Sequence, residues 1–125
     1  MKAYTDINQS KKLAEILSIE SADMRYAPFG DIHPWFWDGH LLEKGAIPCW
    51  SLAALFERVL PLEAEIHKQT DGHKMYYYVE IYTKEICMKL KRMNKPEICL
   101  SSERHENLVD ACVEMILKLY KEKIL

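Results

Sequence analysis

The sequence has few residues that break regular structure, and it has no long apolar run. Its 125 residues include only four glycines and five prolines, too few for a disordered or loop-rich chain. No stretch approaches the roughly 18 consecutive apolar residues that a membrane helix needs. The first residues, MKAYTDINQS, have no apolar stretch behind Lys2 and do not match a secretory signal. We therefore expect a cytoplasmic protein with no membrane partner, folded as a single domain over 1–125.

The chain also lacks a strong net charge of either sign. Its 17 Lys and Arg residues against 19 Asp and Glu residues give a net charge of −2. This balance makes nucleic acid an unlikely partner and offers nothing to an anionic membrane. We expect the four cysteines to be reduced thiols in the cytoplasm. They contain no C-x-x-C pair, which argues against a zinc ribbon or a thioredoxin-type site; they are Cys49, Cys87, Cys99 and Cys112.

Several motifs of catalysis and nucleotide binding are missing. The sequence contains no G-x-x-x-x-G-K-[ST], G-x-G-x-x-G, H-E-x-x-H or G-x-S-x-G. These patterns position phosphates, dinucleotides, zinc ions and serine nucleophiles. We accordingly predict no cofactor, no metal site and no enzymatic activity.

Apolar residues at helical spacing predict three helices, at 7–17, 48–59 and 107–121. Asp6 and Gln9 have the spacing of a capping box at the start of the first helix. Pro48 suits the first turn of the second helix, where a missing N–H costs nothing. Asn107 is a favourable N-cap for the third helix.

After Pro61 the apolar period changes from 3.6 to 2, which predicts strands. Residues 63–102 are expected to form an antiparallel β-meander of three to four strands, with its first turn at Asp71-Gly72. One face of the second strand is apolar, and the helices are expected to pack on this one face. The fold class predicted is therefore α+β. The apolar face comprises Met75, Tyr77, Val79 and Ile81, and the polar face comprises Tyr76, Tyr78, Glu80 and Tyr82.

The segment before the second helix has no clear period. MRYAPF, at 24–29, is consistent with a short strand that Pro28 would confine to a sheet edge. GDIHPWFWDGHLLEKGAI, at 30–47, contains three of the four glycines. We interpret it as a long connection, which in a compact domain is either functional or hides short strands.

Cys49 has two interpretations. At a helix N-terminus its pKa would be lowered, as in cysteine hydrolases. Such an enzyme also needs a histidine base, and no histidine here stands in a recognisable motif. Cysteine is also among the most often buried residue types. We expect Cys49 to be buried and inert, with a small cysteine-dependent hydrolase as the alternative.

Trp35, Phe36 and Trp37 are consecutive in HPWFWDGH, at 33–40. Three adjacent aromatic side chains cannot all face one core, and aromatic residues dominate protein interfaces. We expect Trp35 or Trp37 to be exposed in the monomer and covered by a protein partner or by a second copy in a homo-oligomer.

The same segment offers a metal reading through His33, Asp38 and His40, but their spacing matches no established ligand pattern. A third function is suggested by the tyrosine face of the meander, which resembles platforms for single-stranded nucleic acid. Acidic residues in the same region weaken that reading. The residues involved are Tyr76, Tyr78 and Tyr82, with Lys89, Lys91, Arg92 and Lys95 nearby.

Three stretches resemble a group of short uncharacterised proteins of Bacteroides-type gut anaerobes, often encoded in prophages or other mobile elements. They are the opening MKAYTDINQSKKLAEIL with ESADM, the central PCWSLAALFERVLP and the closing DACVEMILKL. The resemblance implies an accessory protein and lends no catalytic residues. The leading hypothesis is therefore a non-enzymatic protein-binding module, with the hydrolase second and the nucleic-acid binder third.

Overall fold

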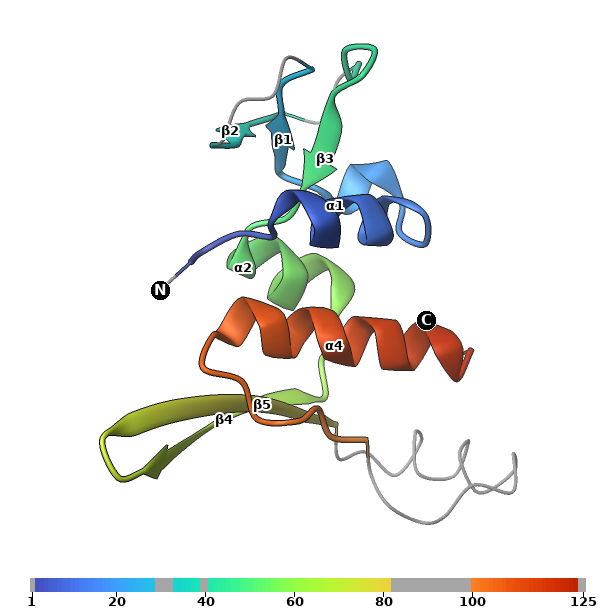
Figure 1. Cartoon of the computed structure of the whole chain (residues 1–125). Helices are drawn as coiled ribbons and strands as arrows, with labels where there is room; N and C mark the ends of the chain where they lie inside the picture. The colour runs from blue at the N-terminus through green and yellow to red at the C-terminus, as the bar shows by residue number, and fades with distance from the viewer. Residues whose placement is uncertain (1, 29–32, 39–40, 82–99, 124–125) are drawn as a thin grey trace. The chain divides into compact units, whose positions relative to one another are not determined.

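Helices and antiparallel strands make up an α+β fold in the computed structural model (Figure 1), which confirms the predicted class. The structure describes residues 2–28, 33–38, 41–81 and 100–123. The chain divides into two compact units, Met1–Val59 and Leu60–Leu125, and each is described by itself. A single domain over 1–125 stays a prediction.

The first unit begins with helix α1, Ile7–Ala14. Asp6 accepts a hydrogen bond from the backbone N–H of Gln9, whose side chain accepts one from the N–H of Asp6. This confirms the predicted capping box. The helix is three residues shorter than the predicted 7–17, because Leu13 O accepts from both Ile16 and Leu17 in a terminal turn. A short 3-10 helix, η1, follows at Ile19–Ser21.

The segment at 30–47, interpreted as a long connection that is either functional or hides short strands, contains one short strand and the first residue of another, both in a three-stranded antiparallel sheet. Strand β1 is Met24–Tyr26, β2 is Trp35–Phe36 and β3 is Ile47–Cys49. Their order is β2-β1-β3, so β1 is central and the prediction of an edge strand was wrong. Pro28 lies beyond the end of β1 and therefore takes no ladder position.

The second helix begins later than predicted. Pro48 lies in β3, and Ser51 is the N-cap of α2, Leu52–Ala54, which continues as a π-helical turn, η2, at Leu55–Val59. Ser51 Oγ accepts from Ala54 N at 3.1 Å. The predicted start at residue 48 was wrong, whereas the predicted end at residue 59 is confirmed.

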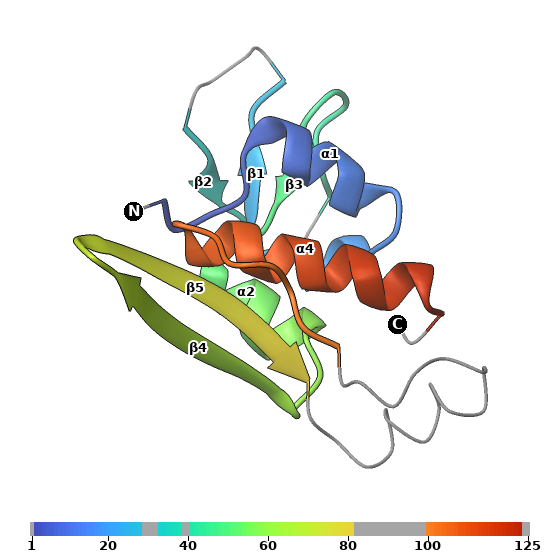
Figure 2. The ribbon, with the colours of Figure 1, turned by 60° about the horizontal axis from the view of Figure 1, so that its bottom comes forward.

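The second unit contains the predicted hairpin (Figure 2). Strand β4, Ala64–Asp71, pairs antiparallel with β5, Lys74–Ile81. Asp71 pairs with Lys74, so the two turn residues are Gly72 and His73, one position later than predicted. Gly72 has φ +65°, a value that glycine adopts without steric cost in this type of turn.

Residues 100–105 run antiparallel along β5 and add a third extended segment beside the hairpin (Figure 2). Helix α4, Leu108–Lys121, follows and packs against β5, with Asn107 as the predicted N-cap. Val79 and Ile81 are buried, as predicted for the apolar face of β5, but Met75 of the same predicted face lies next to the hairpin turn and is 44% exposed. The part of the predicted meander at 82–99 lies outside the described residues.

Candidate functional site

Strand β2 presents two large aromatic side chains to solvent. Trp35 is 62% exposed and Phe36 is 81% exposed, while Trp37 is half-buried. In the ladder, Trp35 lies opposite Arg25 and Phe36 lies opposite Met24. Because successive strand residues point to opposite faces, exposed aromatic surface lies on both faces of β2. The expectation of an exposed tryptophan in this segment is confirmed for Trp35; its burial by a partner stays a prediction.

A shallow hollow of about 410 Å³ lies beside these rings. It is lined by Arg25, Phe36, Trp37 and Asp38. The guanidinium of Arg25 is 3.6 Å from the carboxylate of Glu43. The hollow thus combines an aromatic wall with a paired cation, which suits a polypeptide contact better than a small anion that needs a free positive charge.

Cys49 is buried in β3, two residues before the N-cap of α2. Its thiol lies 3.4 Å from the carbonyl oxygen of Thr5 and 3.5 Å from Thr5 Oγ1. Burial raises the pKa of Cys49, and hydrogen bonds with Thr5 and Ser10 oppose this only in part. The predicted burial is confirmed. The helix N-terminus invoked by the hydrolase alternative is absent at this residue, because the chain is extended there.

The described residues do not support the hypothesis of a metal site at His33, Asp38 and His40. His33 and Asp38 are exposed, whereas His40 lies outside the described residues. In the described part of the chain, no three His, Cys, Asp or Glu side chains converge in a way that could hold a metal ion.

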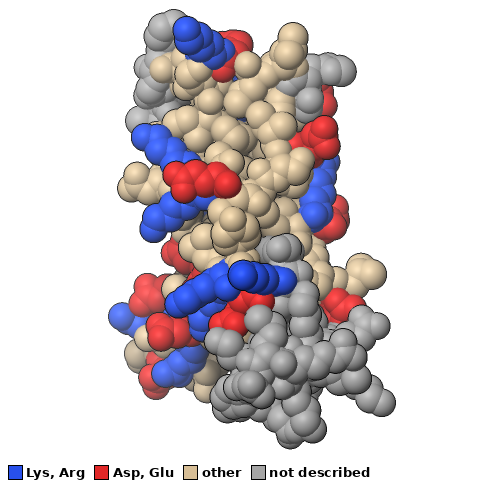
Figure 3. Space-filling view, turned by 90° about the vertical axis from the view of Figure 1, so that its right-hand side faces the viewer, with Lys and Arg blue, Asp and Glu red and all other residues tan. Residues whose placement is uncertain are grey.

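The tyrosine face of β5 is occupied by neighbours from its own unit. Tyr78 stacks on His67, with ring centroids 4.9 Å apart, and the guanidinium of Arg104 lies 5.4 Å from the centroid of Tyr76. Glu80 is opposite Glu65 on the same face, which places negative charge beside the rings. Figure 3 shows acidic and basic side chains intermixed on one side of the molecule. Tyr82 and the lysines and arginine at 89–95 lie outside the described residues.

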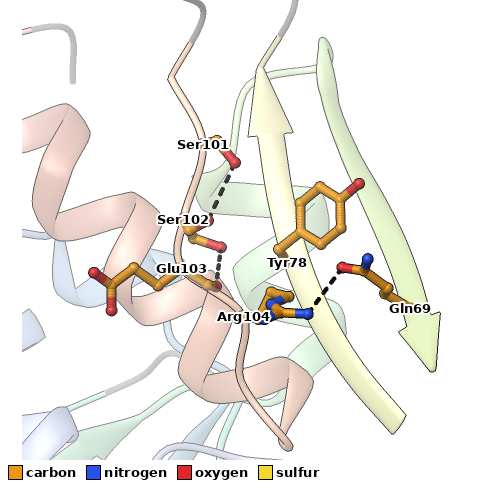
Figure 4. Close-up of a pocket in the computed structure, with 6 residues that line it drawn as sticks. All are labelled: Gln69, Tyr78, Ser101, Ser102, Glu103 and Arg104. Atoms are coloured by element: carbon orange, nitrogen blue, oxygen red, sulfur yellow. Dashed lines mark hydrogen bonds between the residues drawn. The ribbon is translucent and has the colours of Figure 1, made fainter. Parts of the chain in front are cut away.

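A pocket of about 520 Å³ lies next to this face, where the segment 100–105 changes register (Figure 4). Ser101 is paired with Glu80, but His105 is paired with Tyr77. One extra residue is therefore accommodated opposite Tyr78, which is the definition of a β-bulge. The bulge directs Arg104 toward Gln69, with Nη1 3.5 Å from Oε1. The pocket is lined by Gln69, Tyr78, Ser101, Ser102, Glu103 and Arg104.

The bulge is held by a buried serine. Ser102 Oγ accepts from Val79 N at 2.9 Å and donates to the carbonyl oxygen of Glu103 at 3.0 Å. Sequence reasoning missed this pocket. A bulge is visible in a sequence only when the pairing register is already known, and nothing in SSERHEN signals it.

Glu114 of α4 joins the same segment to the helix. Its carboxylate accepts from His105 Nε2 at 2.8 Å and from Glu103 N at 2.7 Å, and it is 3.3 Å from Lys118 Nζ. Burial raises the pKa of Glu114, but these donors outweigh that effect and hold the pKa below its usual range. These contacts connect residues 103 and 105 of the segment before α4 to the helix itself.

No family model, curated protein or solved structure matches the chain. Among the described residues, none of the helices has the length and apolar character needed to cross a membrane.

Proposed function

We propose that the chain is a non-enzymatic protein-binding module and that Trp35 and Phe36 form the centre of its contact surface. The observation that carries this proposal is the exposure of two adjacent aromatic rings, 62% and 81%, on opposite faces of one short strand. Single exposed apolar residues are ordinary on protein surfaces, but adjacent aromatic rings are typical of binding sites.

The size of the exposed rings supports a contact of useful strength. Together they expose on the order of 300 Å² of aromatic surface. Covering that surface contributes about 7 kcal/mol, at roughly 25 cal/mol per Å² and before the cost of association. Two such residues are enough to act as the energetic centre of an interface in which the surrounding contacts mainly exclude water.

Affinity capture from an extract of the encoding organism, followed by mass spectrometry, tests the proposal. The wild-type chain is compared with a Trp35→Ser/Phe36→Ser double variant. Leu62→Ser is the control, because it removes a fully exposed apolar side chain from the second unit. We expect the double variant to lose the captured protein, or self-association, with a dissociation constant at least about thirtyfold higher. Leu62→Ser should behave as wild type. Equal capture by all three would reject the proposal.

A further inference from the structure

The two edges of the sheet in the first unit differ in their free backbone groups. Arg25 of β1 lies opposite Trp35 on one side and Pro48 on the other. A strand residue directs its N–H and C=O to one side only. Trp37 N donates to Asp23 O at 3.0 Å, so Asp23, just before β1, and Arg25, two residues later, direct their backbone groups toward β2. The backbone of Pro48 consequently points away from β1, where it offers no N–H.

The edge beyond β3 is closed by its own chain. Trp50 continues β3 and directs its backbone to the same outer side as Pro48. Its N–H donates to Thr5 Oγ1 at 3.2 Å, and its carbonyl oxygen accepts from Thr5 N at 2.9 Å. Proline and a covering segment are the usual means by which a sheet edge avoids pairing with another chain.

Among the described residues, the outer edge of β2 has one residue whose backbone groups are unpaired. Because Trp35 and Trp37 direct their backbone groups to β1, Phe36 directs its N–H and C=O to the opposite, outer side. Within residues 2–28, 33–38, 41–81 and 100–123, neither group of Phe36 makes a hydrogen bond. An adjacent donor and acceptor on one residue are the complement of an extended backbone.

Building on the proposed function, we propose that the partner is a second copy of the chain, paired through antiparallel β2 strands about a two-fold axis at Phe36. Each Phe36 N–H donates to the Phe36 carbonyl oxygen of the other copy, so the same residue supplies both the donor and the acceptor of the pair. Such self-complementarity is what an isologous interface requires. Trp35 then lies opposite Trp37 of the second copy, an aromatic cross-strand pair. Residues 34–37 carry no charge, so the two strands meet without electrostatic repulsion.

The backbone pairing is tested by comparing Phe36→Pro with Phe36→Ala in sedimentation velocity over a concentration series. Both variants lose the ring, but only proline lacks the outward N–H. Phe36 makes no ladder bond to β1, so the two variants should melt at similar temperatures. We expect a concentration-dependent dimer for wild type, and a dimer dissociation constant between about fivefold and a hundredfold higher for Phe36→Pro than for Phe36→Ala.

A crosslinking measurement tests the axis and remains valid if the proline variant fails to fold. Residues at a hydrogen-bonded antiparallel pair have Cα atoms about 5.5 Å apart, which suits a disulfide. Phe36→Cys should therefore form a dimer crosslink rapidly under mild oxidation. Trp35→Cys is the matched control, because its two copies would lie about 8 Å apart in this register, beyond disulfide reach.

The possible results separate this inference from the proposed function. Equal dimerisation of Phe36→Pro and Phe36→Ala, or equal crosslinking at positions 35 and 36, would overturn the strand pairing. A wild-type chain that stays monomeric at every concentration would overturn the second copy as partner. The proposed function would still stand in that case if capture from the extract depends on Trp35 and Phe36, and it would fall if capture does not.

Discussion

Replacing Glu114 by glutamine should destabilise the chain, because one carboxylate ties the segment before α4 to the helix. It accepts from His105 Nε2 at 2.8 Å and Glu103 N at 2.7 Å, and it is paired with Lys118. Hydrogen bonds to charged groups contribute about 1.5–3 kcal/mol each. The side chain is 24% exposed, so solvent screens part of this, and the amide oxygen of glutamine retains one acceptor. We expect a loss of about 1–2 kcal/mol in the free energy of unfolding.

The effect should depend on pH in a defined direction. The folded chain lowers the pKa of Glu114 below its ordinary value of 4.5, so the contribution is fully present above that value. It is lost as the pH falls through the lower pKa of the folded state. Wild type should therefore lose stability relative to Glu114→Gln as the pH is lowered below about 4.5, and the two should converge in acid.

Thermal unfolding from pH 7 to pH 3 measures this difference. At pH 7 the variant should melt roughly 4–8 °C below wild type. Glu57→Gln, at an exposed position in the first unit, makes the same chemical change outside the network and should leave the melting temperature nearly unchanged. If Glu114→Gln melts at the same temperature as wild type at pH 7, or if the difference between them persists in acid, the ionised carboxylate does not stabilise the fold through these contacts.

Three further substitutions or treatments check other parts of the structure. Cys49 and Cys112 are buried, and burial raises the pKa of both thiols, that of Cys112 to about 12. A thiol reagent applied near neutral pH should therefore modify them only after denaturant is added, as mapped by mass spectrometry. Fast labelling of Cys49 in the native protein would instead support the hydrolase alternative. Ser102→Ala removes the acceptor of the buried Val79 N–H and should cost about 1–3 kcal/mol, with faster amide exchange at Val79; unchanged exchange would contradict the bulge. Ser51→Ala removes the N-cap of α2 and should cost about 1 kcal/mol in denaturant titration; no loss would place the helix start elsewhere.

The parts of the fold that depend on short-range chemistry could be predicted from the sequence. The capping box of Asp6 and Gln9, the cap at Asn107 and the alternating faces of β5 each involve residues close in the chain. Their geometry is decided locally, so the residue types are sufficient to indicate it.

The predictions of local structure were wrong where contacts between residues distant in the chain determine that structure. Proline lacks a backbone N–H, so it is tolerated both in the first turn of a helix and at positions of an edge strand whose backbone points away from the sheet. Pro48 takes the second place because β1 supplies a partner that local sequence does not reveal. The strand at 35–36 has only two residues, too few to show an alternating period, so the sequence indicates no more than a connection that is either functional or hides short strands.

The candidate site was predicted in part. Three consecutive aromatic residues indicate surface exposure on steric grounds alone, and Trp35 and Phe36 are exposed. The outward direction of the Phe36 N–H and C=O could not be predicted from the sequence, because it follows from the strand order β2-β1-β3 and from the hydrogen bond between Trp37 and Asp23. The pocket around Arg104 was missed because it depends on a register shift.

Fluorine NMR of the chain labelled with 5-fluorotryptophan tests the central claim most directly, because the three indoles report separately. Trp50 is fully buried and serves as an internal reference, whereas Trp35 is exposed. In dilute solution the Trp35 signal should show a large solvent isotope shift between H₂O and D₂O. That shift should disappear when the dimer forms or the captured partner is added, while the Trp50 signal stays unchanged. A Trp35 signal that is already shielded from solvent in the dilute monomer, or that remains exposed in the assembled state, would contradict the account.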